Sequence, residues 1–541
     1  MDQFTDDEKA LLSPFFSNMD RQIFALTNLP QVVCGALFSR YSRSSKSLRR
    51  LLLDEFIKDE KSGFSEIVSF AQGSGHDSIV ATQRAEEFYD RVLVGYGDDS
   101  VAELGGAHIA CEGVSNIASK VLEDSRIGIS PLEKSTRYVY FDEKINGKYQ
   151  YYNEKDIMNS RHADIYIETC DSLFDSYAKL IGPTRKWLTQ KYPKGEESER
   201  AYNSTIRAKA CDILRGFLPA STITNVGLYG NGRSFEYLIT KMYASELEEV
   251  RSIAAGMHEE LMKVIPSFVK RAKGKYGDPT IRFISETRKG MEGICQKEFG
   301  GIKPLAGKEV VLTGYDRDAE EKIVAASLYP FTTISMGQVR EIVQKMDSGE
   351  KGRIIDEYLS RRENRRHRPM RGFEHAYYEF DLLANYAAYR DLHRHRMLTQ
   401  QRQLLSANLG FDIPAELGEI GIEREFSEKM NMAQGTYQSI AKDMKAQAQY
   451  AVPFAYKIRW SAYLNARELY HLVELRSTIQ GHRDYRKVAL RMLDEVRKVH
   501  PTIVKHMKFA DYREFEGLER LEAEKRIDSR IEEMKRKYGD K

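Results

Sequence analysis

The stretch RGFLPASTITNVGLYGNGR, from Arg215 to Arg233, has a counterpart in QYAVPFAYKIRWSAYLNAR, from Gln449 to Arg467. In each copy a proline stands twelve residues before an Asn-X-Arg triplet, and an aromatic-rich apolar stretch follows. The triplets begin at Asn231 and Asn465, so the copies lie 234 positions apart (465 − 231). Self-similarity at a fixed spacing is the signature of a duplicated structural unit. The sequence therefore predicts two related halves.

A second pair of matching segments lies upstream of the first. Ser100-Val-Ala-Glu103 resembles Gly372-Phe-Glu374-His375, and each precedes a helix-like stretch, with an offset of 271 positions (374 − 103). Because this offset is 37 positions larger than the first (271 − 234), the first half should carry an insertion. The polar stretch at about 142–200 is the predicted place.

The boundary between the halves is expected near residue 305. There FGGIKPLAG supplies glycine and proline before Lys308–Leu312, a short strand-like run. We expect a first domain at 1–304 and a second at 305–518. A charged helix or tail at 519–541 receives no predicted function.

Composition limits the classes of protein that fit this chain. With 541 residues it exceeds the roughly 250 to 300 residues at which single cores stop growing, so two domains are expected. No run of about 18 apolar residues occurs, which predicts a cytoplasmic protein without a membrane span or secretory leader. The net charge of +3 does not favour nucleic acid. The five cysteines form no CxxC pair, and we expect reduced core thiols and no metal site.

The segment NARELYHLVELR, from Asn465 to Arg476, is the most informative motif. As a helix it places Arg476 on a stripe with Leu469, Leu472 and Val473, apart from Arg467, His471 and Glu474. A guanidinium pressed toward an interior requires an anionic partner, and its planar fork suits phosphate. A structural ion pair or a snorkelling side chain is the alternative interpretation.

Three further segments combine charge with hydrogen-bonding capacity. Arg394-His395-Arg396 could bind a pyrophosphate or an anionic flavin ring, or form a solvated basic face. EKSTRY, from Glu133 to Tyr138, offers phosphate and sugar donors, or an exposed turn before the strand-like run Tyr138–Phe141. The basic run Arg361–Arg371 could line a dinucleotide groove or touch nucleic acid, but such runs are more often solvated surface.

Taken together and in order, these segments resemble the flavin-dependent thymidylate synthases. The signature of that family is RHR, seven residues and then serine, within a longer pattern that ends NExSxRY. Phe373-Glu374-His375 precedes Arg394-His395-Arg396 at the family's spacing, NARELYHLVELR is similar to the C-terminal helix, and EKSTRY is similar to the end of the signature. The resemblance implies an α+β fold of two tandem domains, each with long helices packed on a small antiparallel sheet.

The resemblance also implies chemistry and assembly. In that family FAD, reduced by NADPH, passes a hydride while methylenetetrahydrofolate supplies the carbon to C5 of dUMP, which becomes dTMP. No enzyme nucleophile and no Rossmann fingerprint are needed. The family works as a tetramer whose sites lie between subunits, so a homodimer of this duplicated chain would imitate the tetramer.

Neither half keeps the whole family pattern. The first half has Ser125-Arg126-Ile127 in place of RHR and Met242 in place of the phosphate-binding arginine. The second half has Arg402 and Leu404 in place of the signature glutamate and serine, and Gln449 where the first half has Arg215. The surviving residues are complementary, which favours one complete site assembled from both halves.

The resemblance assigns roles to the residues that match. For the substrate they are Glu133, Ser135, Arg137, Arg215 and Arg476, the last of which is also the candidate catalytic residue. For the flavin they are Glu374, Arg394, His395, Arg396, Asn465, Arg467 and His471. The leading hypothesis is a thymidylate synthase-like flavoenzyme. The alternatives are a non-catalytic nucleotide- or flavin-binding scaffold and a related enzyme that modifies pyrimidine nucleotides.

Overall fold

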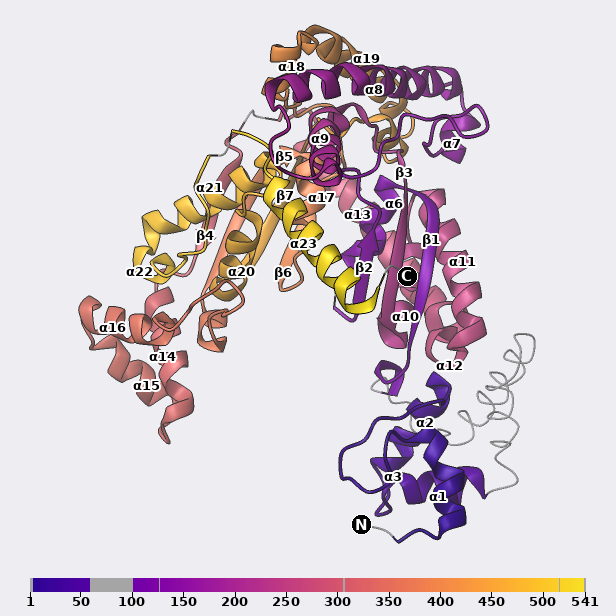
Figure 1. Cartoon of the computed structure of the whole chain (residues 1–541), viewed down its shortest axis with the longest axis vertical. Coiled ribbons are helices and arrows are strands. Elements are labelled where there is room, and N and C mark those ends of the chain that lie inside the picture. Colours follow the sequence, from indigo (N-terminus) through magenta and orange to yellow (C-terminus); the bar gives the residue numbers. More distant parts are fainter. Residues whose placement is uncertain (1–2, 59–100, 126, 305–306, 515, 540–541) are drawn as a thin grey trace. The chain divides into compact units, whose positions relative to one another are not determined.

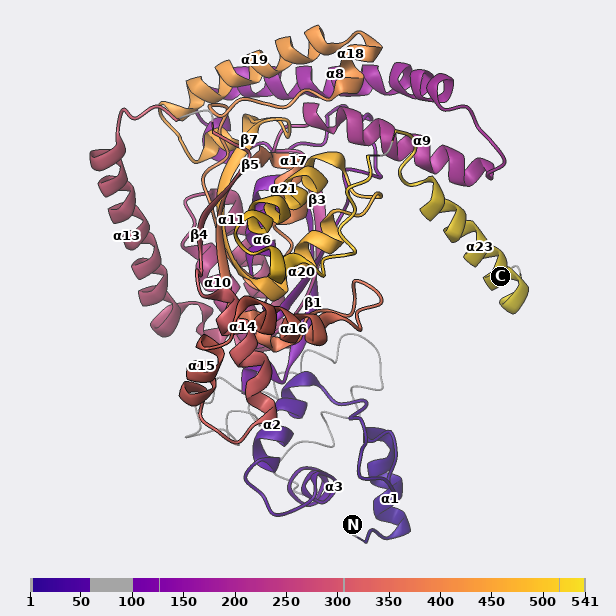
Figure 2. The same cartoon turned by 90° about the vertical axis from the view of Figure 1, so that its left-hand side faces the viewer.

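The computed structural model describes residues 3–58, 101–125, 127–304, 307–514 and 516–539 (Figures 1 and 2). Three positions used above lie outside these residues: Ser100, Arg126 and the expected boundary at 305–306. The chain forms two compact units. Unit 1 comprises Met1–Val114, Ala118–Glu133 and Thr224–Ile302; unit 2 comprises Ser115–Ile117, Lys134–Ile223 and Lys303–Lys541. A long segment from the first half of the sequence thus belongs to unit 2.

Unit 1 contains short N-terminal helices, a three-stranded sheet of order β1-β3-β2, and a group of longer helices. Its elements, with η marking 3-10 and π turns, are α1 (Asp6–Leu12), η1 (Ser13–Phe15), α2 (Gln31–Tyr41), α3 (Leu48–Leu52), η2 (Leu53–Ile57), η4 (Val101–Glu103), β1 (Gly106–Ser115), α6 (Asn116–Asp124), β2 (Ile129–Glu133), β3 (Ile223–Asn231), α10 (Gly232–Tyr243), α11 (Glu248–Val264), α12 (Pro266–Val269), η6 (Lys270–Ala272) and α13 (Gly274–Phe299). Strands β2 and β3 are antiparallel, with Glu133 opposite Val226.

Unit 2 is built on an antiparallel four-stranded sheet of order β4-β5-β7-β6. Its elements are α7 (Lys155–Met158), α8 (Ala163–Lys191), α9 (Glu199–Leu214), η5 (Arg215–Phe217), β4 (Val310–Tyr315), α14 (Ala319–Leu328), η7 (Tyr329–Phe331), α15 (Met336–Gln344), α16 (Ser348–Leu359), η8 (Arg371–His375), β5 (Tyr377–Asn385), α17 (Tyr386–Leu392), β6 (Leu398–Arg402), α18 (Ala415–Ile420), α19 (Glu423–Ala441), η9 (Gln447–Ala451), β7 (Lys457–Asn465), α20 (Ala466–Arg476), α21 (Arg483–Val499), α22 (Pro501–Val504) and α23 (Leu521–Tyr538). Helix α21 packs against β4, β5 and α20. Helices α8 and α19 run side by side in both views (Figures 1 and 2), where the Thr169 and Thr436 hydroxyls lie 2.7 Å apart.

The duplication is visible in the order of the elements. The series β1-α6-β2 and β3-α10-α11-α12 recurs as β5-α17-β6 and β7-α20-α21-α22. Strands β3 and β7 are both nine residues long. Each is followed by a helix with an asparagine N-cap: the Asn231 side chain accepts from Ser234 N at 2.8 Å, and the Asn465 side chain accepts from Glu468 N at 2.9 Å. The predicted α+β fold of two tandem repeats, each with helices on a small antiparallel sheet, is confirmed.

Equivalent segments of the two repeats pair directly within unit 2. Pro219 and Pro453, which occupy the same place in the repeat, form an isolated antiparallel bridge. Ala220 N donates to Val452 O at 2.8 Å, and Phe454 N donates to Leu218 O at 2.9 Å. Each of these hydrogen bonds is the image of the other under the 234-residue offset, as in a two-fold interface where one surface meets its own copy. The pairing ties the segment that begins at Arg215 to the second repeat.

Several local predictions can be compared with the elements. The strand expected at Lys308–Leu312 is present as β4, and the helix expected in NARELYHLVELR is α20. The prediction of a strand at Tyr138–Phe141 is wrong, since these residues form a turn and irregular chain. The Arg520 guanidinium lies 4.5 Å from the Tyr138 ring centroid, within the range of a cation–π contact.

The cysteine prediction holds for part of the set. All five cysteines are free thiols. Cys111, Cys170 and Cys211 are buried, and Cys34 is half-buried. Cys295 is exposed, which contradicts a core position, because α13 buries only Gly277 among its 26 residues. None of the helices in the described ranges is both long enough and apolar enough to cross a membrane.

Candidate anion site in the second unit

Four arginines from distant parts of the sequence surround Asp391, near the end of α17. They are Arg137 in the loop after β2, Arg215 in η5, Arg394 after α17 and Arg476 at the end of α20. Burial opposes ionisation of the Asp391 carboxyl group, yet the four guanidinium groups lower its pKa to about 2. Two of these arginines come from each repeat. The structure therefore brings together the residues that the family resemblance divided between the halves.

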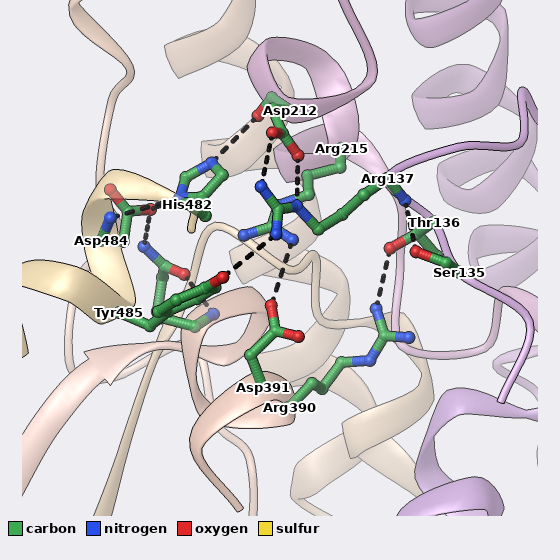
Figure 3. A network of polar contacts seen from close by, with 12 residues as sticks. Ser135, Thr136, Arg137, Asp212, Arg215, Arg390, Asp391, His482, Asp484 and Tyr485 are labelled. Atoms are coloured by element: carbon green, nitrogen blue, oxygen red, sulfur yellow. Dashed lines mark hydrogen bonds and ion pairs between the residues drawn. The ribbon is translucent and has the colours of Figure 1, made fainter. Parts of the chain in front are cut away.

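Arg137 is held by a carboxylate on α9. Its Nε and Nη2 atoms donate to the two oxygens of Asp212, each at 2.8 Å (Figure 3). Its Nη1 atom donates to the Tyr485 hydroxyl at 3.3 Å. Burial of Asp212 is outweighed by Arg137 and then Arg520, which hold the pKa of this carboxyl group well below its usual range. The fork–fork geometry fixes the Arg137 guanidinium firmly.

Arg215 lies beside Arg137 but is far less well paired (Figure 3). The residue is 3% exposed, and its Nη1 atom lies 3.8 Å from Asp391 Oδ2, which is too long for a hydrogen bond. Its Nη2 atom is buried and has no hydrogen-bond partner among the described residues. Burial lowers the pKa of the guanidinium. An under-satisfied buried cation is costly, which indicates a place prepared for an anion.

A pocket opens next to these two arginines. Its walls include Arg137, Asp212, Arg215, Asn385, His482 and Asp484. Its cavity volume is about 60 Å³, enough for several water molecules or one phosphate-sized group. His482 accepts from Asp484 N through Nδ1 at 3.2 Å, and burial together with Arg215 lowers the pKa of its imidazole to about 4. A neutral His482 therefore adds no charge to the pocket.

The EKSTRY segment is divided between the two units. In unit 2, Ser135 Oγ accepts from Arg137 N at 3.2 Å, and Thr136 Oγ1 accepts from Arg390 at 3.2 Å. In unit 1, Glu133 is buried and accepts from Lys120 Nζ at 2.9 Å. Of the predicted substrate residues, Ser135, Arg137, Arg215 and Arg476 thus share unit 2, whereas the Glu133 side chain forms an ion pair in unit 1.

The predicted flavin residues occupy two different environments. Arg394 and Arg396 are exposed, whereas His395 is buried, with Nδ1 2.7 Å from Glu468 Oε1. Arg467 donates to Pro369 O at 2.7 Å and lies 3.3 Å from Glu374, and Asn465 caps α20. His471 is half-buried, with Nδ1 3.4 Å from Glu468. Much of this set therefore contacts other protein groups.

The basic run Arg361–Arg371 also makes internal contacts. Arg362 is buried and pairs with Glu474, with distances of 2.5 and 3.0 Å. Arg361 pairs with Glu357, and Arg371 pairs with Glu374. Three of the six arginines in this run therefore pair with carboxylates.

Sequence reasoning missed the partners of the arginines. Asp212, Asp391, Glu468 and His482 were not singled out. A signal was present, because Asp212 stands three residues before Arg215 and Asp391 three before Arg394, a spacing that joins neighbours on a helix. Such pairs are frequent on solvated helices, so the spacing alone does not identify a site.

The family model described as Thymidylate synthase complementing protein matches residues 53–267 and 311–502. The chain belongs to this family. Each of the two matched segments overlaps one of the two structural repeats.

Relatives of similar length match this chain over almost all of its sequence. A UPF0159 protein of Chlamydia muridarum is 45% identical over 527 residues, which cover 97% of this chain and 98% of the relative. A UPF0159 protein of Thermoplasma acidophilum is 34% identical over 519 residues, covering 91% and 98%. Among solved structures, the UMP/dUMP methylase PolB of Streptomyces cacaoi bound with 5-Br dUMP is 19% identical with a TM-score of 0.29, covering 36% of this chain and 93% of PolB.

Proposed function

We propose that this chain binds the phosphate of dUMP at the arginines around Asp391 and methylates the nucleotide to dTMP, with FAD, NADPH and methylenetetrahydrofolate. The observation that carries the proposal is the buried Arg215 guanidinium, whose Nη2 donor has no partner among the described residues. A phosphate monoester supplies the paired acceptor oxygens that this group lacks.

The pocket wall is balanced overall, with five cationic and five carboxylate side chains, so the argument for an anionic ligand rests on how the individual arginines are paired. Arg137 is neutralised by Asp212, with which it forms two hydrogen bonds. Arg215, Arg394 and Arg476 share the carboxylate of Asp391, which Arg215 approaches only to 3.8 Å. A phosphate in the adjacent pocket would receive donors from Arg215 and, through Nη1, from Arg137. Arg476 is the residue that we expect to touch the reacting nucleotide.

The residues after α17 fit an anionic cofactor in chemical type. Arg394 and Arg396 are exposed guanidinium groups two positions apart, a donor set that suits a pyrophosphate. FAD, when bound there and reduced by NADPH, would supply the hydride for the reductive methylation. The chain's own residues would bind the flavin's charged groups and hold the nucleotide phosphate.

The contacts of the predicted flavin residues favour a second candidate function, a non-catalytic nucleotide-binding scaffold. Asn465 caps α20, Arg467 donates to Pro369 O and His395 Nδ1 contacts Glu468, so these three residues have little capacity left for a flavin. A scaffold would retain affinity for dUMP but would neither hold flavin nor form product.

Flavin content and turnover separate the two candidates. The purified protein should show flavin absorbance close to one equivalent per nucleotide site and should form dTMP from dUMP when both co-substrates are supplied. Arg215→Met should raise the KM for dUMP by roughly ten- to a hundredfold, the value of one lost charge-assisted contact. Arg207→Met, which removes an exposed arginine of α9, is the matched control and should leave KM unchanged. Binding of dUMP without flavin or product would establish the scaffold.

A further inference from the structure

A chain of five side chains connects Arg476 to Arg368 through two histidines. Arg476 Nε donates to His395 Nε2 at 3.0 Å, and His395 Nδ1 lies 2.7 Å from Glu468 Oε1. On the other side of Glu468, His471 Nδ1 lies 3.4 Å from the carboxylate, and Arg368 Nη2 lies 3.0 Å from His471 Nε2. His395 and Glu468 are both buried.

The direction of each hydrogen bond follows from the arginines. A guanidinium group can only donate, so the Nε2 atoms of His395 and His471 must both accept. Each imidazole therefore carries its proton on Nδ1 and donates toward the Glu468 carboxylate. Both rings are neutral in this arrangement, and the carboxylate is the acceptor at its centre. Burial, with a further contribution from Arg476, lowers the pKa of His395 to about 4, in agreement with a neutral ring.

We propose that His395 and Glu468 are positioning residues for Arg476, an inference that rests on the proposed nucleotide site. His395 engages the Nε atom of Arg476, which keeps both terminal nitrogens for other partners. Among the described residues, those nitrogens make no hydrogen bond, while the guanidinium carbon lies 5.9 Å from the Tyr485 ring centroid. Arg137 contacts the same ring. The hydrogen bonds from Glu468 through His395 to Arg476, here called the positioning relay, thus turn the Arg476 guanidinium group toward the cluster that contains Arg137 and Asp391.

The same three groups could be taken for a metal site, because ligand atoms of His395, Glu468 and His471 lie within 4.8 Å of one another. An ion bound at the two Nδ1 atoms would force the ring protons onto Nε2. Those protons would then point at the N–H groups of Arg476 and Arg368, so that two hydrogen-bond donors would face each other with no acceptor between them. The arginines therefore favour the positioning relay over a cation.

The position of the ring proton can be measured without any nucleotide. In protein labelled with ¹⁵N-histidine, the shifts of the two ring nitrogens distinguish Nδ1–H from Nε2–H, and His395→Gln identifies the signals of His395. We expect the neutral Nδ1–H form between pH 6 and 8 and no zinc retained after dialysis against a weak chelator. The Nε2–H form, or one bound zinc per chain, would overturn the relay.

The effect on Arg476 is measured by calorimetric titration with dUMP. His395→Ala should weaken binding by about tenfold, the effect of releasing one charge-assisted hydrogen bond. His395→Gln should stay within about threefold of the wild type, because its amide oxygen can still accept from Arg476 Nε. His506→Ala removes another carboxylate-bound histidine, 2.7 Å from Asp356, and should leave affinity unchanged.

Each result leads to a different conclusion. Equal losses in His395→Ala and His395→Gln, or no loss in either, would overturn the positioning role. If wild-type protein does not bind dUMP, the proposed function fails, while the ring-proton measurement still decides whether the relay exists.

Discussion

Arg215 shows most clearly how one residue can be unfavourable for folding and favourable for binding. Its guanidinium group is buried, lies 3.8 Å from its nearest carboxylate and leaves Nη2 unsatisfied among the described residues. Removing a cation from water costs several kcal/mol when pairing is incomplete. A phosphate would offset that cost only when nucleotide is bound.

This reasoning predicts opposite effects of Arg215→Met on stability and on affinity. Methionine keeps much of the side-chain volume but has no charge to desolvate. We expect the thermal midpoint of the ligand-free protein to stay the same or rise, while the stabilisation produced by saturating dUMP disappears. Differential scanning fluorimetry with and without dUMP measures both. A large fall of the ligand-free midpoint with an intact dUMP shift would show that Arg215 is structural.

Two buried histidines predict a loss of stability on mild acidification. The pKa values of His395 and His482 are lowered to about 4 by burial, against about 6.5 in an unfolded chain. In the unfolded state these imidazoles therefore bind a proton below about pH 6.5, whereas in the folded state they stay neutral down to about pH 4. In that window each histidine lowers the free energy of unfolding by up to about 1.4 kcal/mol per pH unit.

Tryptophan fluorescence measures this effect in the right unit, since Trp187 and Trp460 both belong to unit 2. Urea midpoints should fall between pH 7.5 and 5.5, and the fall should be smaller in His395→Gln. An identical pH dependence in the variant and the wild type would show that His395 is not buried as a neutral ring.

At the scale of elements, α23 is more than a charged tail. Arg520, just before the helix, is buried and donates to Asp212 Oδ2 at 3.1 Å, and Glu519 accepts from Lys209 at 2.7 Å. Within the helix, Arg200 of α9 pairs with Glu524 at 2.8 Å. The C-terminal segment thus supports the carboxylate that holds Arg137.

Truncation tests this role of the C-terminal segment. A chain that ends at Leu518 loses Glu519 and Arg520, so Asp212 loses one charge-assisted donor, and we expect dUMP affinity to fall by about tenfold. A chain that ends at Ser529 keeps Arg520, Glu524 and Asp528 and should bind like the full chain in calorimetry. Equal affinity of the two truncated chains would exclude a contribution from Arg520.

At the scale of the whole molecule, the duplication places within one chain a contact between repeats that would otherwise join two subunits. The self-pairing of Pro219 and Pro453 is a two-fold contact of the kind that joins identical subunits. The family resemblance implies sites among four domains, and this chain supplies two. We therefore expect at least a dimer in sedimentation velocity. A monomer that still binds flavin and dUMP would contradict that expectation.

The sequence predicted those features that depend on local patterns. From the sequence we could predict the 234-residue repeat, the helix after Asn465 and the complementary pair Arg215 and Arg476. The partners of these arginines could not be predicted from the sequence, because the contacts of Arg137 with Asp212 and of Arg476 with His395 join residues 75 and 81 positions apart. The prediction of a strand at Tyr138–Phe141 failed because a strand needs a second strand to pair with, and the described residues pair none with this segment.

The central claim is that the two repeats jointly hold one nucleotide phosphate, and a double-mutant cycle on dUMP affinity tests it most directly. Arg215→Met and Arg476→Met should each weaken binding by roughly ten- to a hundredfold. The double variant should lose less than the sum of the two free energies, because both arginines would contact one ligand. The account predicts one site per chain with this coupling. Strictly additive losses, or two sites per chain each sensitive to one arginine, would contradict it.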